Sequence, residues 1–133
     1  MAITVKTLPD PLPKTLACPT KGFLATFYAT ASGTSRDPSS IGKDAAINAA
    51  NDQQAALTAA VAAEAAKWKP RCEEGCDGHI RIVSGPDHDT QAHEIFDRRH
   101  HIEIIGYEAT LIVWEVVSAT CVPSPEQKKQ KGG

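Results

Sequence analysis

The chain has 133 residues, of which 41% are hydrophobic and 23% are charged, proportions that are typical of one globular domain. Its formal net charge of −2 excludes the strongly basic surface that nucleic-acid binding requires, so we expect no nucleic-acid partner. No apolar run is long enough for a membrane span, and the low aromatic content predicts a core of alanine and aliphatic side chains.

The segment 1–21 contains four prolines and little periodicity, which predicts an extended arm. Its start, MAITVKTLPD, has neither the basic residues nor the apolar run of a signal peptide, although a mature exported protein recloned behind a new methionine would look the same. The segment 22–32, GFLATFYATAS, then alternates between two faces and predicts a strand.

The strongest pattern is the alanine-rich stretch 43–69, which predicts one long helix. Pro70 ends this helix, and its alanine flanks allow it to lie close against a sheet. One stripe at 3.6-residue spacing should face that sheet, and it consists of Ile47, Ala50, Gln54, Leu57, Val61, Ala65 and Trp68.

The rest of the chain is dominated by strand patterns. The segment 79–84, HIRIVS, predicts a strand, 85–91 a loop, and 90–99 one or two helical turns. Residues 100–122 are strand-forming throughout, and Gly106 leaves two alternatives, a hairpin turn or a bulge in a single bent strand.

These elements predict an α+β domain over 22–122 and a flexible polar tail over 123–133. We expect two layers, with one long helix packed on an antiparallel sheet in strand–helix–strand–strand order. In the bulge alternative, all the cysteines lie at one end of this domain.

The four cysteines are Cys18, Cys72, Cys76 and Cys121, and they allow three disulfide pairings. Cys72 and Cys76 have a spacing that suits either a disulfide or one half of a zinc site. Glu73 and Glu74 disfavour the thiolate that a redox pair needs, and the two remaining cysteines stand alone in the sequence. We therefore favour disulfides Cys72–Cys76 and Cys18–Cys121, with buried thiols and zinc as alternatives.

The five histidines cluster between residues 79 and 101, together with several carboxylates. If 90–101 were helical, His93, Asp97 and His101 would share one face, with His88 nearby as a fourth ligand, and zinc would suit such a set. The alternative is a solvated polar connection between two strands. No G-x-S-x-G motif or phosphate loop is present, so we expect no catalytic site and no cofactor.

The segment 107–113, YEATLIV, resembles the last strand of the dodecins, small oligomeric flavin-binding proteins of strand–helix–strand–strand order. Glu108 stands where that family has glutamine, and the flavin-stacking tryptophan of its second strand has no counterpart in HIRIVS. The resemblance implies the same topology, and it adds flavin binding as a third functional alternative.

The segment LIVWEVV is apolar on both faces of a strand, with Leu111 and Val113 on one face and Trp114 and Val116 on the other. One helix can cover only one face of the sheet, so the other face must meet the N-terminal arm or a second subunit. We therefore predict a homo-oligomer, with these four residues as interface candidates.

Together, these patterns predict a non-enzymatic, extracytoplasmic structural or interaction module that is oligomeric, stabilised by disulfides and able to bind a protein partner. The alternative function is metal or small-ligand binding through the Asp- and His-rich segment 87–101.

Overall fold

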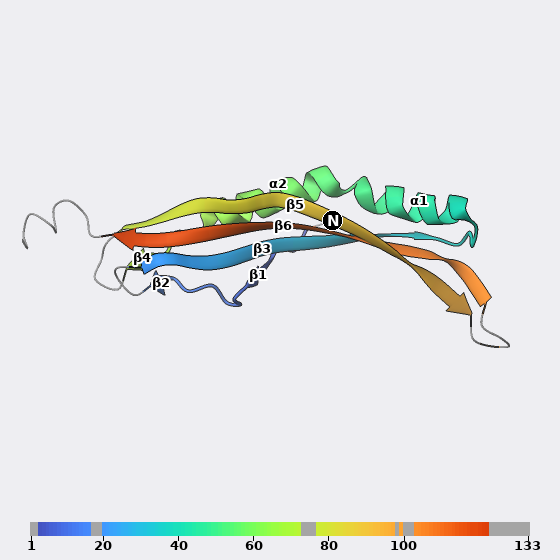
Figure 1. The fold of residues 1–133 in the computed structure, drawn as a ribbon, viewed down its shortest axis with the longest axis horizontal. Helices are drawn as coiled ribbons and strands as arrows, with labels where there is room; N and C mark the ends of the chain where they lie inside the picture. Colours follow the sequence, from blue (N-terminus) through green and yellow to red (C-terminus); the bar gives the residue numbers. More distant parts are fainter. Residues whose placement is uncertain (1–2, 17–19, 73–76, 98, 100–102, 123–133) are drawn as a thin grey trace, which may run out of the picture.

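The computed structural model describes residues 3–16, 20–72, 77–97, 99 and 103–122. The chain is an α+β protein in which a bent helical segment lies on one face of a largely antiparallel sheet (Figure 1). Within the described part of the chain, no helix combines the length and the apolar character that crossing a bilayer requires. In chain order, the elements are β1 (Lys6–Leu8), β2 (Thr15–Leu16), β3 (Thr20–Ser35), α1 (Ser40–Asn51), α2 (Gln54–Lys67), β4 (Arg71–Cys72), β5 (Asp77–Asp97) and β6 (Glu103–Val122).

The sheet has the strand order β1-β3-β6-β5-β4-β2. The long strand β6 lies at its centre and pairs antiparallel with both β3 and β5. The segment predicted as an extended arm supplies the two edge strands, because β1 pairs with β3 while β2 pairs in parallel with β4.

The strand β5 continues through the region that the sequence predicted as a loop and helical turns, so that prediction is wrong. The pairing with β6 shifts register around Gly85 and Pro86, and it then runs from Asp87 opposite Trp114 to Asp97 opposite Glu103. Residues in 87–97 have weak local strand propensity, but the ladder to β6 satisfies their backbone groups. Pairing with a distant segment therefore decides their conformation.

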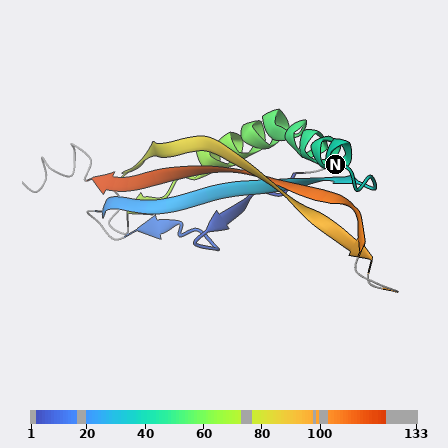
Figure 2. The same cartoon turned by 45° about the vertical axis from the view of Figure 1, so that its right-hand side comes forward.

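Gly106 lies within the continuous strand β6, so the structure has the bulge and not the hairpin turn. Ile95 faces Gly106 whereas Phe96 faces Ile104, which leaves one β6 residue unmatched. A Cβ atom on Gly106 would lie 2.1 Å from the carbonyl oxygen of Ser35, so only glycine fits here. Toward Asp97 and Glu103, the paired ends of β5 and β6 bend away from the helices (Figure 2).

The predicted single helix is divided into α1 and α2 by a bend at Asp52 and Gln53. Backbone hydrogen bonds continue across the bend, since the Gln53 amide donates to Ala50 and the Leu57 amide donates to Gln53. The Gln53 side chain also donates from Nε2 to the carbonyl oxygen of Ser32 at 3.1 Å. This contact fixes the bend against β3, and the two halves follow the twisted sheet.

The core lies between the helices and the helix-side residues of β3 and β6. Its buried members include Phe27, Leu57, Val61, Leu111 and Val113, together with several alanines. At the α1 end, a Cβ on Gly33 would lie 2.3 Å from the Ala46 carbonyl oxygen, so the α1 backbone directly approaches β3.

The N-terminal segment crosses the helix side of the sheet near the end of α2. The indole Nε1 of Trp68 donates a hydrogen bond to the Pro13 carbonyl oxygen at 3.0 Å. Leu16 is buried against Ala119, with Phe23 and Ile80 packed around them. This segment therefore closes one end of the core.

Candidate functional site

Two features of the fold are candidates for function: the sheet face opposite the helices, and a pocket beside α2. Side chains of β3 and β6 alternate between two faces, and Phe27 and Val113 point toward the helices. Their neighbours Tyr28 and Trp114 point to the opposite side, which we call the open face. Among the described residues, no helix lies on that side (Figure 1).

The centre of the open face is apolar and aromatic. Tyr28 pairs with Trp114 across the β3–β6 ladder, and Thr26 pairs with Val116. Leu24, one of the larger apolar residues of this face, keeps 59% of its surface exposed. Exposed apolar groups that adjoin one another are unusual on a monomer and mark an interaction surface.

On the open face, β5 carries a positive and a negative residue at two separate positions. Arg81 lies opposite Ser118, whereas Asp87 lies opposite Trp114, and Val116 falls between these two rows. The hydroxyl of Ser84 donates to Oδ2 of Asp87 at 3.0 Å. A positive and a negative group therefore stand on the two sides of an apolar centre.

The structure divides the predicted interface residues between the two faces. Trp114 and Val116 lie on the open face, each half-buried by its neighbours in the sheet. Leu111 and Val113 have no exposed surface and belong to the core beneath the helices, so the prediction is wrong for these two. The cause is that Leu111 and Val113 lie on the face of β6 that the helices cover, where they pack with Leu57 and Val61.

The predicted metal face does not form, because β5 replaces the helix on which it depended. Its four residues are His88, His93, Asp97 and His101. His93 approaches Oε1 of Glu108 at 3.3 Å on the open face, whereas His88 contacts Gln54 of α2. His101 lies outside the described residues. Among the described residues, no cluster of three His, Cys, Asp or Glu side chains could hold a metal ion.

The cysteine pairing stays a prediction, since Cys18 and Cys76 lie outside the described residues. The backbone of Cys72 is the partner of Leu16, and the backbone of Cys121 is the partner of Thr20 and Gly78. These described neighbours all lie at one end of the sheet, where β2 and β4 end and β3 and β5 begin.

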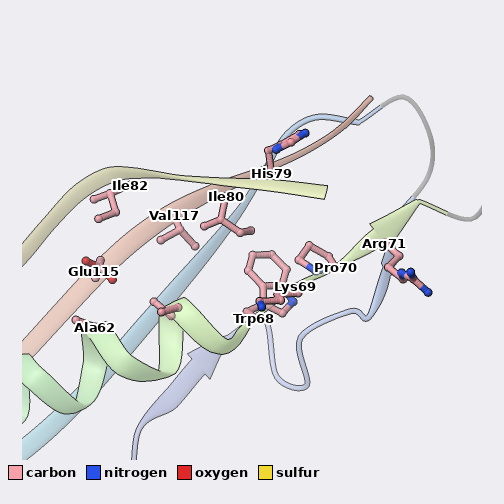
Figure 3. A pocket seen from close by; sticks show the side chains of 12 residues that line it. Ala62, Trp68, Lys69, Pro70, Arg71, His79, Ile80, Ile82, Glu115 and Val117 are labelled. Atoms are coloured by element: carbon pink, nitrogen blue, oxygen red, sulfur yellow. The ribbon is translucent and has the colours of Figure 1, made fainter. Parts of the chain in front are cut away.

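A pocket of about 660 Å³ lies between α2 and the strands β5 and β6 (Figure 3). Its sheet side is formed by Ile80, Ile82 and Val117. Its helix side includes Ala62 of α2, and Trp68 lies where α2 ends. Ile82 keeps 58% of its surface exposed, so the pocket opens toward solvent.

One carboxyl group lines this apolar pocket, that of Glu115. The residue is only 2% exposed, and no hydrogen bond or ion pair joins its carboxyl to another described residue. Burial raises the pKa of Glu115 above its ordinary value, since water is withheld from the charged form.

The sheet geometry explains why space remains beside Glu115. On one side it faces Phe27, but on the other side the β5 register skips from Ser84 to Asp87. Gly85, which lies in this gap, has no side chain, and a Cβ atom there would lie 2.7 Å from the Trp114 carbonyl oxygen. The strand therefore supplies no side chain that could partner the carboxyl group.

The sequence analysis does not single out Glu115, because it takes LIVWEVV as apolar on both faces, one toward the helix and one toward the arm or a second subunit. The available signal was its position: Glu115 is two residues from Val113 and two from Val117, on a face that was expected to meet the helix. An acid in such a row is paired, neutral or in contact with water.

Comparisons of the chain with protein-family models, with curated proteins and with solved structures found no match. The functional argument therefore depends on the chemistry of the open face and the pocket.

Proposed function

We propose that the chain is a non-enzymatic interaction module that associates with a second copy of itself through the open face. The observation that carries this proposal is the uncovered apolar centre around Tyr28 and Trp114. Aromatic and aliphatic side chains in such a centre contribute most of the binding free energy of protein interfaces.

The charge arrangement supports a symmetric pair. If a two-fold axis runs across the strands near Val116, between two facing sheets, then the β5 strands of two copies lie antiparallel over each other. Arg81 of each copy would then stand over Asp87 of the other. Such an isologous interface closes at two copies, because each contact occurs twice.

The unit that associates is proposed to be a two-layer body of strand–helix–strand–strand order, extracytoplasmic and stabilised by the pairs Cys72–Cys76 and Cys18–Cys121. The described neighbours of Cys72 and of Cys121 lie at the same end of the sheet, and this placement supports the two disulfides. Disulfides would be consistent with an oxidising compartment.

Light scattering coupled to size-exclusion chromatography tests the association. We expect twice the mass of one chain at about 50 μM, a concentration chosen for a micromolar dissociation constant. Trp114→Glu should give single chains, because the substitution places a charge in the apolar centre. Ile41→Glu, which changes an exposed apolar residue of α1, is the matched control and should leave the pair intact.

Charge reversal examines the geometry of the pair. Arg81→Asp or Asp87→Arg alone should weaken association, because each creates like charges across the axis, whereas the double variant should restore it. A wild-type chain that stays single at 50 μM would refute the association itself. An unaltered affinity in both single variants would refute the two-fold arrangement alone.

A further inference from the structure

We propose that the pocket between α2 and β5 is a binding site for a hydrophobic amine, a small molecule with an apolar body and one protonated amino group that pairs with Glu115. This site is on the helix side of the sheet, so the proposal does not depend on association through the open face.

The carboxyl group supplies the polar end of the site. The residue as a whole is only 2% exposed, its carboxyl group has no partner among the described residues, and its oxygens are accessible from the open pocket. A carboxylate with apolar neighbours loses part of its hydration, and a cation brought to it forms a charge-assisted hydrogen bond. A ligand ammonium would satisfy this group.

The walls supply the apolar end. Ile80, Ile82 and Val117 approach from the sheet, opposite the alanines of α2, and Trp68 stands at the end of the pocket (Figure 3). These side chains offer no hydrogen-bonding groups apart from the Trp68 indole, which already donates to Pro13. The volume of about 660 Å³ falls in the usual range of small-molecule sites.

The cationic residues of the pocket do not replace the ligand. Lys69, Arg71 and His79 belong to the lining at the end away from Glu115, and Figure 3 shows the side chains of Arg71 and His79 directed away from the cavity. No described lysine or arginine forms an ion pair with Glu115. In the proposed complex, the positive charge comes from the bound molecule.

A matched set of probes separates charge recognition from apolar binding: decylamine, decanol and decanoate, titrated by calorimetry at pH 7 below their aggregation concentrations. We expect the amine to bind at least tenfold more tightly than the alcohol, and decanoate to bind most weakly. Equal affinity for amine and alcohol, or tighter binding of decanoate, would overturn the proposal.

Three variants assign the effect to this pocket. Glu115→Gln should reduce amine affinity to that of the alcohol and leave alcohol binding unchanged. Glu64→Gln, an exposed glutamate of the same helical side, removes an equal charge outside the lining and should change nothing. Ala62→Phe should abolish binding of both probes by filling the cavity.

Unaltered amine affinity in Glu115→Gln would refute the site even if decylamine binds elsewhere. The variant Trp114→Glu separates amine binding from self-association. Its single chains should still bind the amine with wild-type affinity. Loss of amine binding in that variant would contradict the independence of the two surfaces.

Discussion

Glu115 lies in the helix-side row of β6, where its neighbours Val113 and Val117 are fully buried core residues. Desolvation raises the pKa of its carboxyl group, and no described residue forms a hydrogen bond or ion pair with that group. A group of this kind lowers the stability of the fold when it is ionised.

The pH dependence of stability should reveal this cost. Because the pKa of Glu115 is raised on folding, the protonated form is favoured by the fold, and its stabilising contribution is lost as the pH rises through the folded pKa. Glu115→Gln should therefore increase the free energy of unfolding at pH 7 and have little effect near pH 4.

Urea denaturation of both proteins at the two pH values measures this difference. An equal effect at pH 4 and pH 7 would show that packing, and not ionisation, distinguishes the glutamine variant. Glu64→Gln is the exposed control, for which we expect only a small change at either pH.

At the scale of elements, the helix position depends on small side chains. Gly33 allows the α1 backbone to reach β3, and Ala46 and Ala50 are fully buried where the two elements meet. A Cβ at position 33 would lie 2.3 Å from the Ala46 carbonyl oxygen and 2.6 Å from the Ala50 nitrogen, and neither atom can move independently because both belong to the backbone of α1.

Gly33→Ala should therefore lower the free energy of unfolding by about 2 to 4 kcal/mol, since α1 has to move away from the sheet. Thr34→Ala changes an exposed neighbour on the open face and should cost less than about 1 kcal/mol. Chemical denaturation monitored by circular dichroism compares the two. Equal stabilities would mean that the contact between helix and strand is looser than the structure indicates.

The sequence predicts elements well where local patterns decide the conformation. The alanine-rich stretch and Pro70 locate the helical segment and its end, although the bend at Asp52 also requires the Gln53 contact with Ser32. The strand β5 beyond Gly85 could not be predicted, because its residues are ordered by pairing with β6 and not by their own propensities.

The candidate site was less predictable than the fold. The apolar face of their strand suggests Trp114 and Val116 as interface residues, and that role stays a prediction. The metal set depended on a helix over 90–101, whereas the structure has strand β5 up to Asp97. The pocket depends on the β5 register shift at Gly85, which no local pattern indicates. Recognising Glu115 therefore requires knowing which face of β6 meets the helices.

At the scale of the whole molecule, the proposed disulfide Cys18–Cys121 would join the N-terminal segment to the last strand, and Cys72–Cys76 would close a short local loop. The number of reactive thiols, counted in denaturant without reductant, should be zero for protein produced under oxidising conditions. Reduction should then lower the free energy of unfolding by about 2 to 5 kcal/mol. Four reactive thiols in such protein would contradict both disulfides.

The central position of β6 has a consequence for folding during synthesis. β3 and β5 each pair with β6 and not with one another, so neither long ladder can form until residues 103–122 have been made. The alanine-rich helices can form as soon as they emerge, but their apolar stripe then has no sheet to cover. A ribosome-bound chain that stops before β6 should therefore expose this stripe to chaperones, and release of the final strand should trigger cooperative collapse.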